Sequence, residues 1–239
     1  MKVIALLTGR GNNTLKDKNL IHIQGKPALY YPANAARKCG EIDNWFCSSD
    51  DKEILRVADQ LGYIPILRPS DLSTPHTQHE DVIVHALDHI RKQNCNPEIL
   101  VVLLANNVTI KSEWISECII RMRQDASISS VVPVYQDNDH HPLRAKRIDT
   151  NGSLFTYIEN SPSPQQISSN RQDLPKCYFL AHNFWVLNVQ MLEKPFEGEP
   201  PWRFMGKSVS PYIIDKPVDL HEQSDVELAC RWVKDNYID

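Results

Sequence analysis

The sequence lacks any long apolar run. None approaches the roughly 20 residues that a helix needs to cross a bilayer. The opening run Val3–Leu7 is interrupted by Thr8-Gly9-Arg10, too early for a secretory signal. We therefore expect no contact with a membrane, and we expect the protein to remain in the cytoplasm.

Paired cysteines are also missing. Six cysteines are spread along 239 residues, and no two of them form a C-x-x-C pair. This spacing argues against a zinc site and against a disulfide framework, so buried free thiols are the better interpretation. The sequence contains no internal repeat, linker or low-complexity block, and 41% of it is hydrophobic, which predicts one globular domain over residues 1–239.

Charge of one sign is only slightly in excess, with a formal net charge of −4, but it is unevenly distributed. Residues 1–38 carry seven cations and one acid, giving +6, whereas the remaining 201 residues carry 19 cations and 29 acids, giving −10. A positive end on an acidic body favours a small anionic ligand over a nucleic acid, which needs an extended basic face. A solvated basic helix face is the alternative.

The first 135 residues alternate strand-like apolar runs with helical patterns. The predicted strands are 2–7, 45–48, 63–67, 99–104 and 130–134, and the predicted helices are 27–40, 50–61, 77–93 and 112–124. Capping-box spacing places helix starts at Asp50 and Thr77, and Ser112 is a further cap. This alternation predicts an α/β fold in which helices cover both faces of a mainly parallel sheet.

The alternation stops between Tyr135 and Pro175. This segment is rich in Asn, Asp, Ser and Pro, and Asn151-Gly152 separates two short strand-like runs, which predicts a hairpin. We interpret 136–175 as an arm inserted outside the regular winding of the sheet. Strand-like runs at 184–187 and 208–214 follow, and Ser224 is the expected cap of a last helix to about residue 236.

The loop after the first predicted strand carries the strongest indication of function. Thr8-Gly9-Arg10-Gly11 is followed by two lysines, and glycines let backbone N–H groups approach a phosphate closely. The third glycine of a dinucleotide fingerprint is missing, as are the P-loop motif and the G-x-S-x-G elbow of hydrolases. Dehydrogenases and P-loop NTPases are therefore not supported, and a structural turn with exposed lysines is the alternative.

Seven short motifs, spread in order over nearly the whole chain, resemble the CMP-acylneuraminate (sialic acid) synthetases and their cytidylyltransferase relatives. They are Arg10-Gly11 with Lys18-Asn19-Leu20, Gly25-Lys26-Pro27, Ser48-Ser49-Asp50, Leu67-Arg68-Pro69, His140-His141-Pro142, Arg171-Gln172-x-Leu174-Pro175 and Val218-Asp219. The resemblance implies a three-layer α/β/α nucleotidyltransferase domain, with an arm at 136–175 through which two copies of the chain form a homodimer. The implied reaction joins CTP to a sialic-acid-like sugar acid and releases pyrophosphate, for surface glycan synthesis.

The same resemblance assigns roles to individual residues. The implied nucleotide-binding residues are Arg10, Gly11, Asn12, Lys18, Ser49, Arg68 and Asn106. Lys18 and Asp219 are the implied catalytic residues, and Asp219 is the implied ligand of Mg²⁺, a hard cation that binds one or two carboxylates together with phosphate oxygens. Positioning and cations do most of the work in such a transfer, because charge accumulates on phosphate oxygens.

Three departures from the family pattern keep alternatives open. The family's D-x-D pair is here Asp219-Leu220-His221, so His221 is either a poorer partner for Mg²⁺ or a surface residue beside an Asp219 that acts alone. The fourth strand ends in a rewritten loop, Ala105–Thr109. An expected arginine before Ala181-His182-Asn183 is missing, which leaves Arg144 and Arg171 as candidates to bind the acceptor carboxylate.

These departures leave two other functions open. The first alternative is a nucleotidyltransferase that acts on another acceptor, such as a Kdo-like acid. The second is a non-catalytic nucleotide-binding homologue. His76 and His79 are interpreted as loop residues, and the i, i+4 pair His85 and His89 as helix-face residues without a metal.

Overall fold

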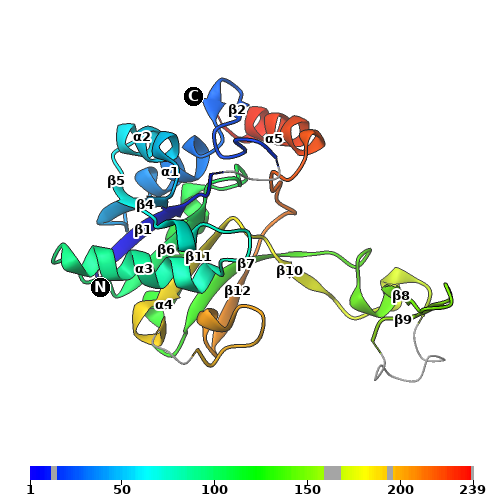
Figure 1. The fold of residues 1–239 in the computed structure, drawn as a ribbon. Coiled ribbons are helices and arrows are strands. Elements are labelled where there is room, and N and C mark those ends of the chain that lie inside the picture. Colours follow the sequence, from blue (N-terminus) through cyan, green and yellow to red (C-terminus); the bar gives the residue numbers. More distant parts are fainter. Residues whose placement is uncertain (12–14, 159–167, 193–195, 238–239) are drawn as a thin grey trace.

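An eight-stranded sheet forms the centre of the protein (Figure 1). The computed structural model describes residues 1–11, 15–158, 168–192 and 196–237. The strands run in the order β10-β7-β11-β6-β1-β4-β5, and β12 pairs with β7. Their bounds are β1 Val3–Thr8, β4 Asn44–Ser49, β5 Ile64–Leu67, β6 Ile99–Leu104, β7 Ser130–Gln136, β10 Tyr178–Leu180, β11 Phe184–Asn188 and β12 Val209–Ile213.

The sheet confirms the predicted α/β class and adds two antiparallel strands. β1, β4, β5 and β6 are mutually parallel, and β12 is parallel to β7. β11 lies antiparallel between β6 and β7, and β10 pairs antiparallel with β7. Because β11 runs against its neighbours, its amino end meets the carboxyl ends of β1 and β6 at one edge of the sheet.

Helices cover both faces of the sheet and make the three layers that the resemblance implied. Their bounds are α1 Tyr30–Lys38, α2 Lys52–Gln60, α3 His79–Lys92, α4 Ser112–Gln124 and α5 Gln223–Asn236. Alternate residues of β1 explain the layering: Val3, Ala5 and Leu7 pack with α1, α2 and α4, whereas Ile4 and Leu6 pack with α3. Every residue of β6 is buried, as predicted for a strand covered on both sides.

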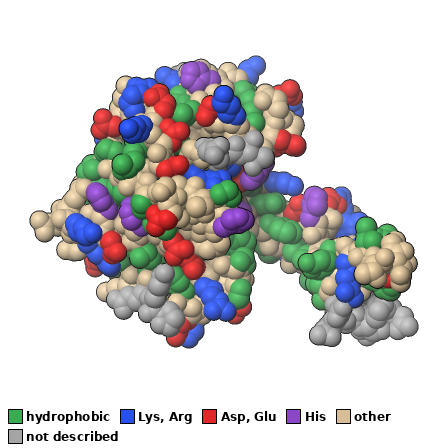
Figure 2. Space-filling model, in the orientation of Figure 1, with side chains coloured by type: hydrophobic (Ala, Val, Ile, Leu, Met, Phe, Trp, Pro, Cys, Tyr) green, Lys and Arg blue, Asp and Glu red, His purple; other side chains and the backbone are tan. Residues whose placement is uncertain are grey.

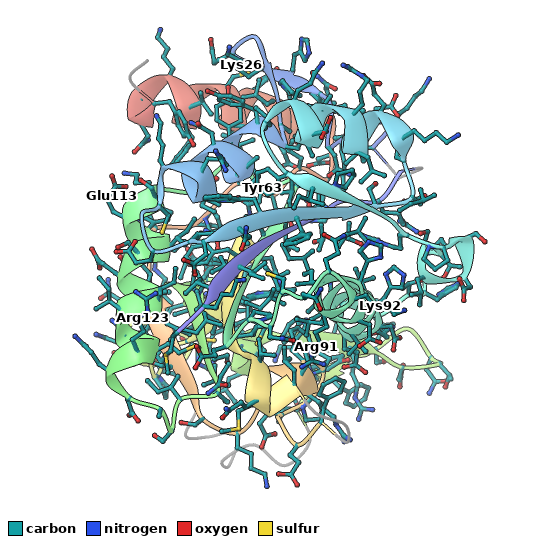
Figure 3. All side chains as sticks on the ribbon, turned by 90° about the vertical axis from the view of Figure 1, so that its left-hand side faces the viewer. Lys26, Tyr63, Arg91, Lys92, Glu113 and Arg123 are labelled. Carbon is teal, nitrogen blue, oxygen red and sulfur yellow. The ribbon has the colours of Figure 1, made fainter. Side chains whose placement is uncertain are left out.

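Figure 3 shows polar side chains on the outer side of a covering helix and a buried ring between the layers. Glu113 and Arg123 lie on the outer side of α4 and are exposed. Tyr63 lies inside, where it is 1% exposed and its hydroxyl donates to the carbonyl of Ala33 at 3.0 Å. None of the helices in the described part of the chain combines the length and the apolar character that a membrane crossing needs.

A small hairpin and the last helix close one end of the sheet. β2 (His22–Ile23) pairs with β3 (Lys26–Pro27), and this hairpin packs with α5 in a separate apolar cluster. The prediction that Pro27 opens a helix is wrong, because α1 begins at Tyr30. Short 3₁₀ helices occupy Ser70–Leu72, Pro142–Arg144, Arg171–Asp173, Val189–Leu192 and Arg203–Met205.

The predicted helix caps are displaced by one or two residues. Asp51, not Asp50, caps α2, because its Oδ1 accepts from the backbone N–H groups of Glu53 at 2.7 Å and Ile54 at 3.3 Å. The Glu53 carboxylate pairs with Arg56 instead of reaching back. This shift leaves the Asp50 side chain available to the glycine loop.

The other two predicted boxes are also corrected. The Thr77 hydroxyl accepts from the backbone of Thr74, and α3 begins two residues later without a side-chain cap. The last helix is capped by a box made of Glu222 and Asp225, not by Ser224, whose hydroxyl donates to the Glu222 side chain. Ser112 is the first residue of α4, which has no side-chain cap.

An arm projects from the far end of β7 and β10, as Figures 1 and 2 show. It carries the predicted hairpin, formed by β8 (Lys146–Ile148) and β9 (Leu154–Thr156), with Gly152 at a positive φ of 80° in the turn. Several of its apolar side chains are exposed, among them Ile148 at 71%, Leu154 at 67% and Tyr157 at 65%. This much exposed apolar surface on one projecting element is typical of a surface that another protein covers.

Candidate functional site

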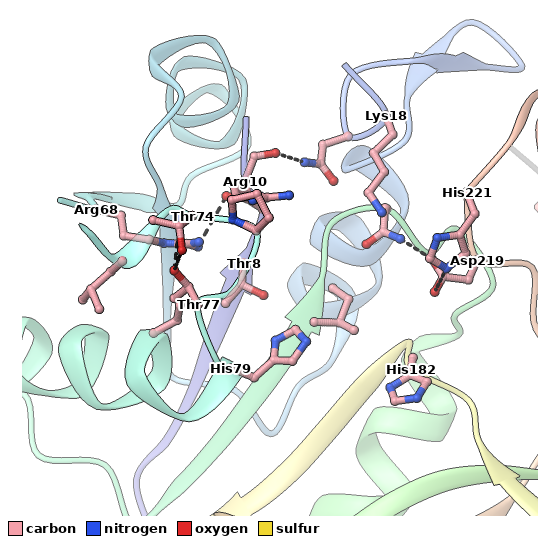
Figure 4. A pocket seen from close by; sticks show the side chains of 17 residues that line it. Thr8, Arg10, Lys18, Arg68, Thr74, Thr77, His79, His182, Asp219 and His221 are labelled. Carbon is pink, nitrogen blue, oxygen red and sulfur yellow. Dashed lines mark hydrogen bonds and ion pairs between the residues drawn. The ribbon is translucent and has the colours of Figure 1, made fainter. Parts of the chain in front are cut away.

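A cavity of about 460 Å³ opens at the edge of the sheet where β1 and β6 end and β11 begins (Figure 4). This edge is where open α/β sheets bind ligands. The lining residues are Thr8, Gly9, Arg10, Lys18, Asn19, Arg68, Leu72, Thr74, Pro75, Thr77, His79, Val82, Leu104, Asn106, His182, Asp219 and His221. We call this cavity the edge pocket.

The glycine loop forms one wall of the edge pocket. Gly9 has no room for a side chain, because a Cβ there would lie 3.1 Å from the Cβ of Ala105 and 3.2 Å from Asn19. Asn19 in turn donates from Nδ2 to the carbonyl of Arg10 at 2.8 Å. The N–H of Gly11 donates to Asp50 at 3.0 Å, so this group is engaged by the protein itself and does not point at a ligand. Asn12 lies outside the described residues.

Arg68 holds the ends of β1 and β4 together from inside the protein. Its side chain is 6% exposed, and it donates to the carbonyl and hydroxyl of Ser48 at 2.7 and 3.3 Å and to the carbonyl of Gly9 at 3.4 Å. Burial lowers the pKa of Arg68, and the Asp50 carboxylate opposes this shift. Arg68 therefore lines the edge pocket and positions the glycine loop at the same time.

Ser49 does not reach the edge pocket. It is fully buried, its hydroxyl accepts from the N–H of Asp51 at 3.0 Å, and its carbonyl accepts from the N–H of Arg68 at 2.8 Å. These bonds form the turn from β4 into α2. The structure therefore corrects the expected direct contact of Ser49 with a nucleotide to a role in shaping the loop.

Two of the seven cations in residues 1–38 line the edge pocket, Arg10 and Lys18. Burial lowers the pKa of the Lys18 ammonium, the negative charge of Asp219 opposes that shift, and Arg10 adds to it. Others lie elsewhere: Arg37 packs over the ring of Trp45 at 3.9 Å, and Lys26 over that of Tyr30 at 5.4 Å. Only part of the positive charge of residues 1–38 therefore lies at the site.

Asp219 lies near Lys18 in the wall of the edge pocket (Figure 4). Its carboxylate is 26% exposed, one oxygen accepts from the Asn106 amide, and the other lies 2.9 Å from Nε2 of His221. A backbone bridge between Asn107 and Asp219 fixes this segment beside the end of β6. The structure thus brings together three of the residues expected at the site, Lys18, Asn106 and Asp219.

Asn107 does not share this role. It is fully buried, it donates to the carbonyls of Ala181 and His182 at 3.3 Å each, and its side-chain oxygen accepts from Thr109. Of these two neighbouring asparagines, Asn106 therefore lines the edge pocket and Asn107 does not. The rewritten loop after β6 supplies one pocket residue and one structural residue.

His79 and His182 are pocket residues that sequence reasoning did not assign to the site. His79 is the first residue of α3 and its ring lies edge-on to that of Trp185 at 5.1 Å. Desolvation by the atoms of the pocket, followed by His182 and Arg68, lowers the pKa of His79 to about 4, although part of the side chain is exposed. Burial also lowers the pKa of His182, with Asp219 opposing the shift. The signal available beforehand was the histidine at position 182, in the segment that departs from the family pattern.

Arg144 and Arg171 lie on the arm and not in the edge pocket of their own chain. Arg171 forms two bonds to the carboxylate of Asp139, at 2.6 and 2.7 Å, and Arg144 donates to the Asp139 carbonyl at 3.2 Å. The arm projects away from the pocket (Figure 1). Within one chain, the expected contact of these arginines with an acceptor is therefore not formed.

The edge pocket offers a divalent cation one carboxylate, from Asp219. Among the described residues, no group of three or more His, Cys, Asp or Glu side chains is arranged to hold a metal. A single carboxylate suits Mg²⁺, which keeps several waters and takes its remaining ligands from substrate phosphates. The donor set therefore fits a magnesium ion that enters with a phosphorylated substrate.

A sheet edge with a glycine loop, three cationic side chains and one carboxylate is typical of a nucleotide-binding α/β protein. The chain belongs to the cytidylyltransferase family, whose model matches residues 7–194. It is 25% identical to the pseudaminic acid cytidylyltransferase of Campylobacter jejuni subsp. jejuni, over 96% of this chain and 95% of that protein. Its identity to the CMP-N,N'-diacetyllegionaminic acid synthase of Legionella pneumophila is also 25%, over 92% and 93%.

Solved structures confirm the fold. A structure of CMP:2-keto-3-deoxy-manno-octonic acid synthetase complexed with CTP matches 99% of this chain and 100% of that chain, with a TM-score of 0.73 and 15% identity. The three-layer nucleotidyltransferase architecture implied by the sequence motifs is therefore the observed one.

Proposed function

We propose that the protein transfers CMP from CTP to a nonulosonic, sialic-acid-like sugar acid and releases pyrophosphate. The observation that carries this proposal is the edge pocket, which brings the cations Arg10 and Lys18 together with the carboxylate of Asp219 in a chain of the cytidylyltransferase family. The cations suit a triphosphate, and the carboxylate suits a divalent metal that would enter with it.

The transfer breaks one bond and forms one. The acceptor hydroxyl oxygen attacks the α-phosphorus of CTP and loses its proton, while the bond from that phosphorus to the bridging oxygen breaks and pyrophosphate leaves. Arg10 and Lys18 are placed to stabilise the charge that gathers on the phosphate oxygens. Arg68 and Asn19 hold the loop that carries Arg10, so fewer atoms have to reorganise during the transfer.

Magnesium is the proposed metal, with Asp219 as its protein ligand. When bound, it neutralises charge on the phosphates and orients them. His221 keeps its own hydrogen bond to Asp219, and its imidazole is a poorer ligand for a hard cation than a carboxylate. Asp219 acting as the sole protein ligand is therefore the arrangement that we propose.

The acceptor class follows from the names of the full-length relatives. Proteins named for pseudaminic acid and for diacetyllegionaminic acid align over more than nine-tenths of this chain. A Kdo-like acid is the second candidate, favoured by the match over the whole length of the 2-keto-3-deoxy-manno-octonic acid synthetase. Both are sugar acids, so the acceptor carries a carboxylate in either case.

We also propose that the protein works as a homodimer joined through the arm. Its exposed apolar residues Ile148, Leu154 and Tyr157 need a cover. Docking of the arm on a second copy would bury this surface and would bring Arg144 and Arg171 towards the partner's edge pocket. In this arrangement the two arginines bind the acceptor carboxylate of the neighbouring subunit.

Pyrophosphate release tests the activity. Each nucleoside triphosphate is combined with N-acetylneuraminate, legionaminate, pseudaminate or Kdo in the presence of Mg²⁺, and we expect release with CTP and one or more nonulosonic acids. Asp219→Asn keeps the shape of the side chain and removes its charge, so turnover should be lost while the protein stays folded. Asp235→Asn, which removes a charge from α5, is the control and should leave turnover unchanged.

Two results would contradict the proposal. Release with no combination would remove the activity, and calorimetry would then identify a non-catalytic nucleotide-binding homologue if CTP with Mg²⁺ binds tightly. Full turnover of Asp219→Asn would remove Asp219 from the mechanism.

A further inference from the structure

Asp17 has a backbone conformation that residues with a side chain seldom adopt. Its φ is +54°, in the left-handed region that glycine enters freely and that Asp and Asn enter more readily than other residues. Asp17 directly precedes Lys18 and Asn19, which both line the edge pocket. Residues in such conformations persist where the surrounding structure imposes them, and they gather at ligand sites.

The turn around Asp17 is held on both sides. The Asp17 carbonyl accepts from the N–H groups of Leu20 at 2.7 Å and Ile21 at 3.1 Å. The N–H of Lys18 donates to the carbonyl of Leu15 at 3.3 Å. Leu15 packs against the apolar cluster of the hairpin and α5, whereas Leu20 packs against the cluster that contains α1 and α2. The chain has to reverse its direction between these two anchors, and the left-handed residue makes that reversal.

The reversal brings the next two residues to the edge pocket. The Lys18 side chain points into the pocket near Asp219 (Figure 4). Asn19 is 2% exposed and donates to the carbonyl of Arg10 at 2.8 Å. A right-handed φ at residue 17 would turn the following peptide group, and the Lys18 side chain with it, away from this direction. The place of Lys18 in the pocket therefore depends on the backbone of Asp17.

The carboxylate of Asp17 does not itself form part of the pocket. Asp17 is exposed and does not line the pocket, and its side chain forms no hydrogen bond or ion pair with any other described residue. Its negative charge also opposes the binding of a triphosphate nearby. We infer that Asp17 is a positioning residue, whose left-handed backbone directs Lys18 towards the phosphates of the nucleotide.

This inference rests on the proposed function and is tested with two variants that lose the same charge. Asp17→Asn keeps a side chain that tolerates the left-handed region, and Asp17→Ala does not. We expect the dissociation constant for CTP with Mg²⁺, measured by calorimetry, to rise about fivefold or more in Asp17→Ala, because Lys18 then reaches the pocket in only a fraction of the molecules. In Asp17→Asn it should stay within about twofold of wild type or decrease.

Two further variants separate this role from a structural one. Asn94→Ala is the matched control, because Asn94 is exposed, lies after α3 and has a similar φ of 57°. Both alanine variants should melt a few degrees below wild type, but only Asp17→Ala should weaken the binding of CTP. In a Lys18→Met background, Asp17→Ala should cause no further loss of affinity, since the side chain that it positions is already gone.

Three results would overturn the inference and leave the proposed function standing. The first is an unchanged affinity for CTP in Asp17→Ala. The second is equal weakening in Asp17→Ala and Asp17→Asn, which would assign the effect to the charge. The third is an undiminished effect of Asp17→Ala in the Lys18→Met background, which would show that it does not act through Lys18. No binding of CTP by the wild type would instead overturn the proposed function, and this assignment with it.

Discussion

Replacing Arg68 by methionine tests whether burial of the side chain or the length of its hydrogen bonds decides how much an arginine contributes to the free energy of unfolding. Arg68 and Arg56 both form several hydrogen bonds. Those of Arg56 are short, 2.5 and 2.8 Å to the carboxylate of Glu53, but its side chain is 53% exposed. Arg68 has one short bond of 2.7 Å to Ser48, with two longer ones, and is 6% exposed.

The magnitude for Arg68 follows from its contacts. One short bond from a charged donor is worth about 1.5–3 kcal/mol, and the contacts at 3.3 and 3.4 Å add little. The Ser48 carbonyl keeps a second donor, the N–H of Gly9 at 3.3 Å, so it is not left unpaired. Removing a buried charge offsets part of the loss. We expect Arg68→Met to lower the free energy of unfolding by about 2 kcal/mol, or about 4–8 °C in melting temperature.

Urea unfolding followed by circular dichroism measures this difference, with Arg56→Met as the matched variant. An exposed pair contributes little, because water screens it and both side chains lose freedom, so Arg56→Met should unfold like the wild type. The affinity for CTP should fall at least tenfold in Arg68→Met alone, since the loop that carries Arg10 loses its support. Equal destabilisation of the two variants, or a larger effect at Arg56, would refute the reasoning.

Three further predictions follow from the pocket and the arm. The pKa of His79 is about 4 in the folded protein against 6.5 unfolded, so the unfolded chain binds the extra proton between these values. The free energy of unfolding therefore falls as the pH drops from 6.5 towards 4. In His79→Gln this fall should be smaller, which urea unfolding midpoints measured across that pH range would show. His221→Asp adds a hard oxygen ligand beside Asp219 and should lower the Mg²⁺ concentration for half-maximal turnover several-fold. Phe155→Asp, on the exposed face of the arm, should convert the dimer to monomer in light scattering.

His76→Gln, at an exposed position before α3, should keep the wild-type pH dependence, and an equally steep fall in His79→Gln would contradict the assignment. An unchanged or raised Mg²⁺ requirement in His221→Asp would show that position 221 does not face the metal. Monomeric wild-type protein, or a Phe155→Asp variant that stays dimeric, would remove the arm from the interface.

The layered fold could be predicted because its determinants are local. Runs such as 99–104 are apolar throughout, and their shortness and content of β-branched residues favour a strand covered on both faces. The hairpin of the arm follows from Asn151-Gly152, whose turn conformation needs little from the rest of the chain. Relative order and handedness of the parallel units then follow from general rules of connection.

Helix starts were less predictable, because several side chains near each start have the right chemistry. Asp50 and Asp51 are both good caps, and only the three-dimensional position of Gly11 explains why Asp50 bonds to the glycine loop while Asp51 caps α2. The competing partner lies 39 residues away in sequence. A local pattern contains no information about such a distant competitor. Thr77 failed as a cap for another reason, because its hydroxyl bonds to Thr74 within the preceding turn.

The residues of the site also differ in whether local sequence or distant parts of the chain determine their place. Arg10 and Lys18 could be predicted, because they belong to the loop that ends β1 and their charge identifies them. Asp219 required the family motif, since its partner Asn106 lies 113 residues earlier and backbone contacts of the folded chain bring the two together. His182 lines the edge pocket from a left-handed backbone that a hydrogen bond from Asn107, after a different strand, helps to hold, and a local sequence pattern does not indicate such a conformation. A pocket residue of this kind is therefore identified by the conformation that the fold forces on it, and not by its neighbours in the sequence.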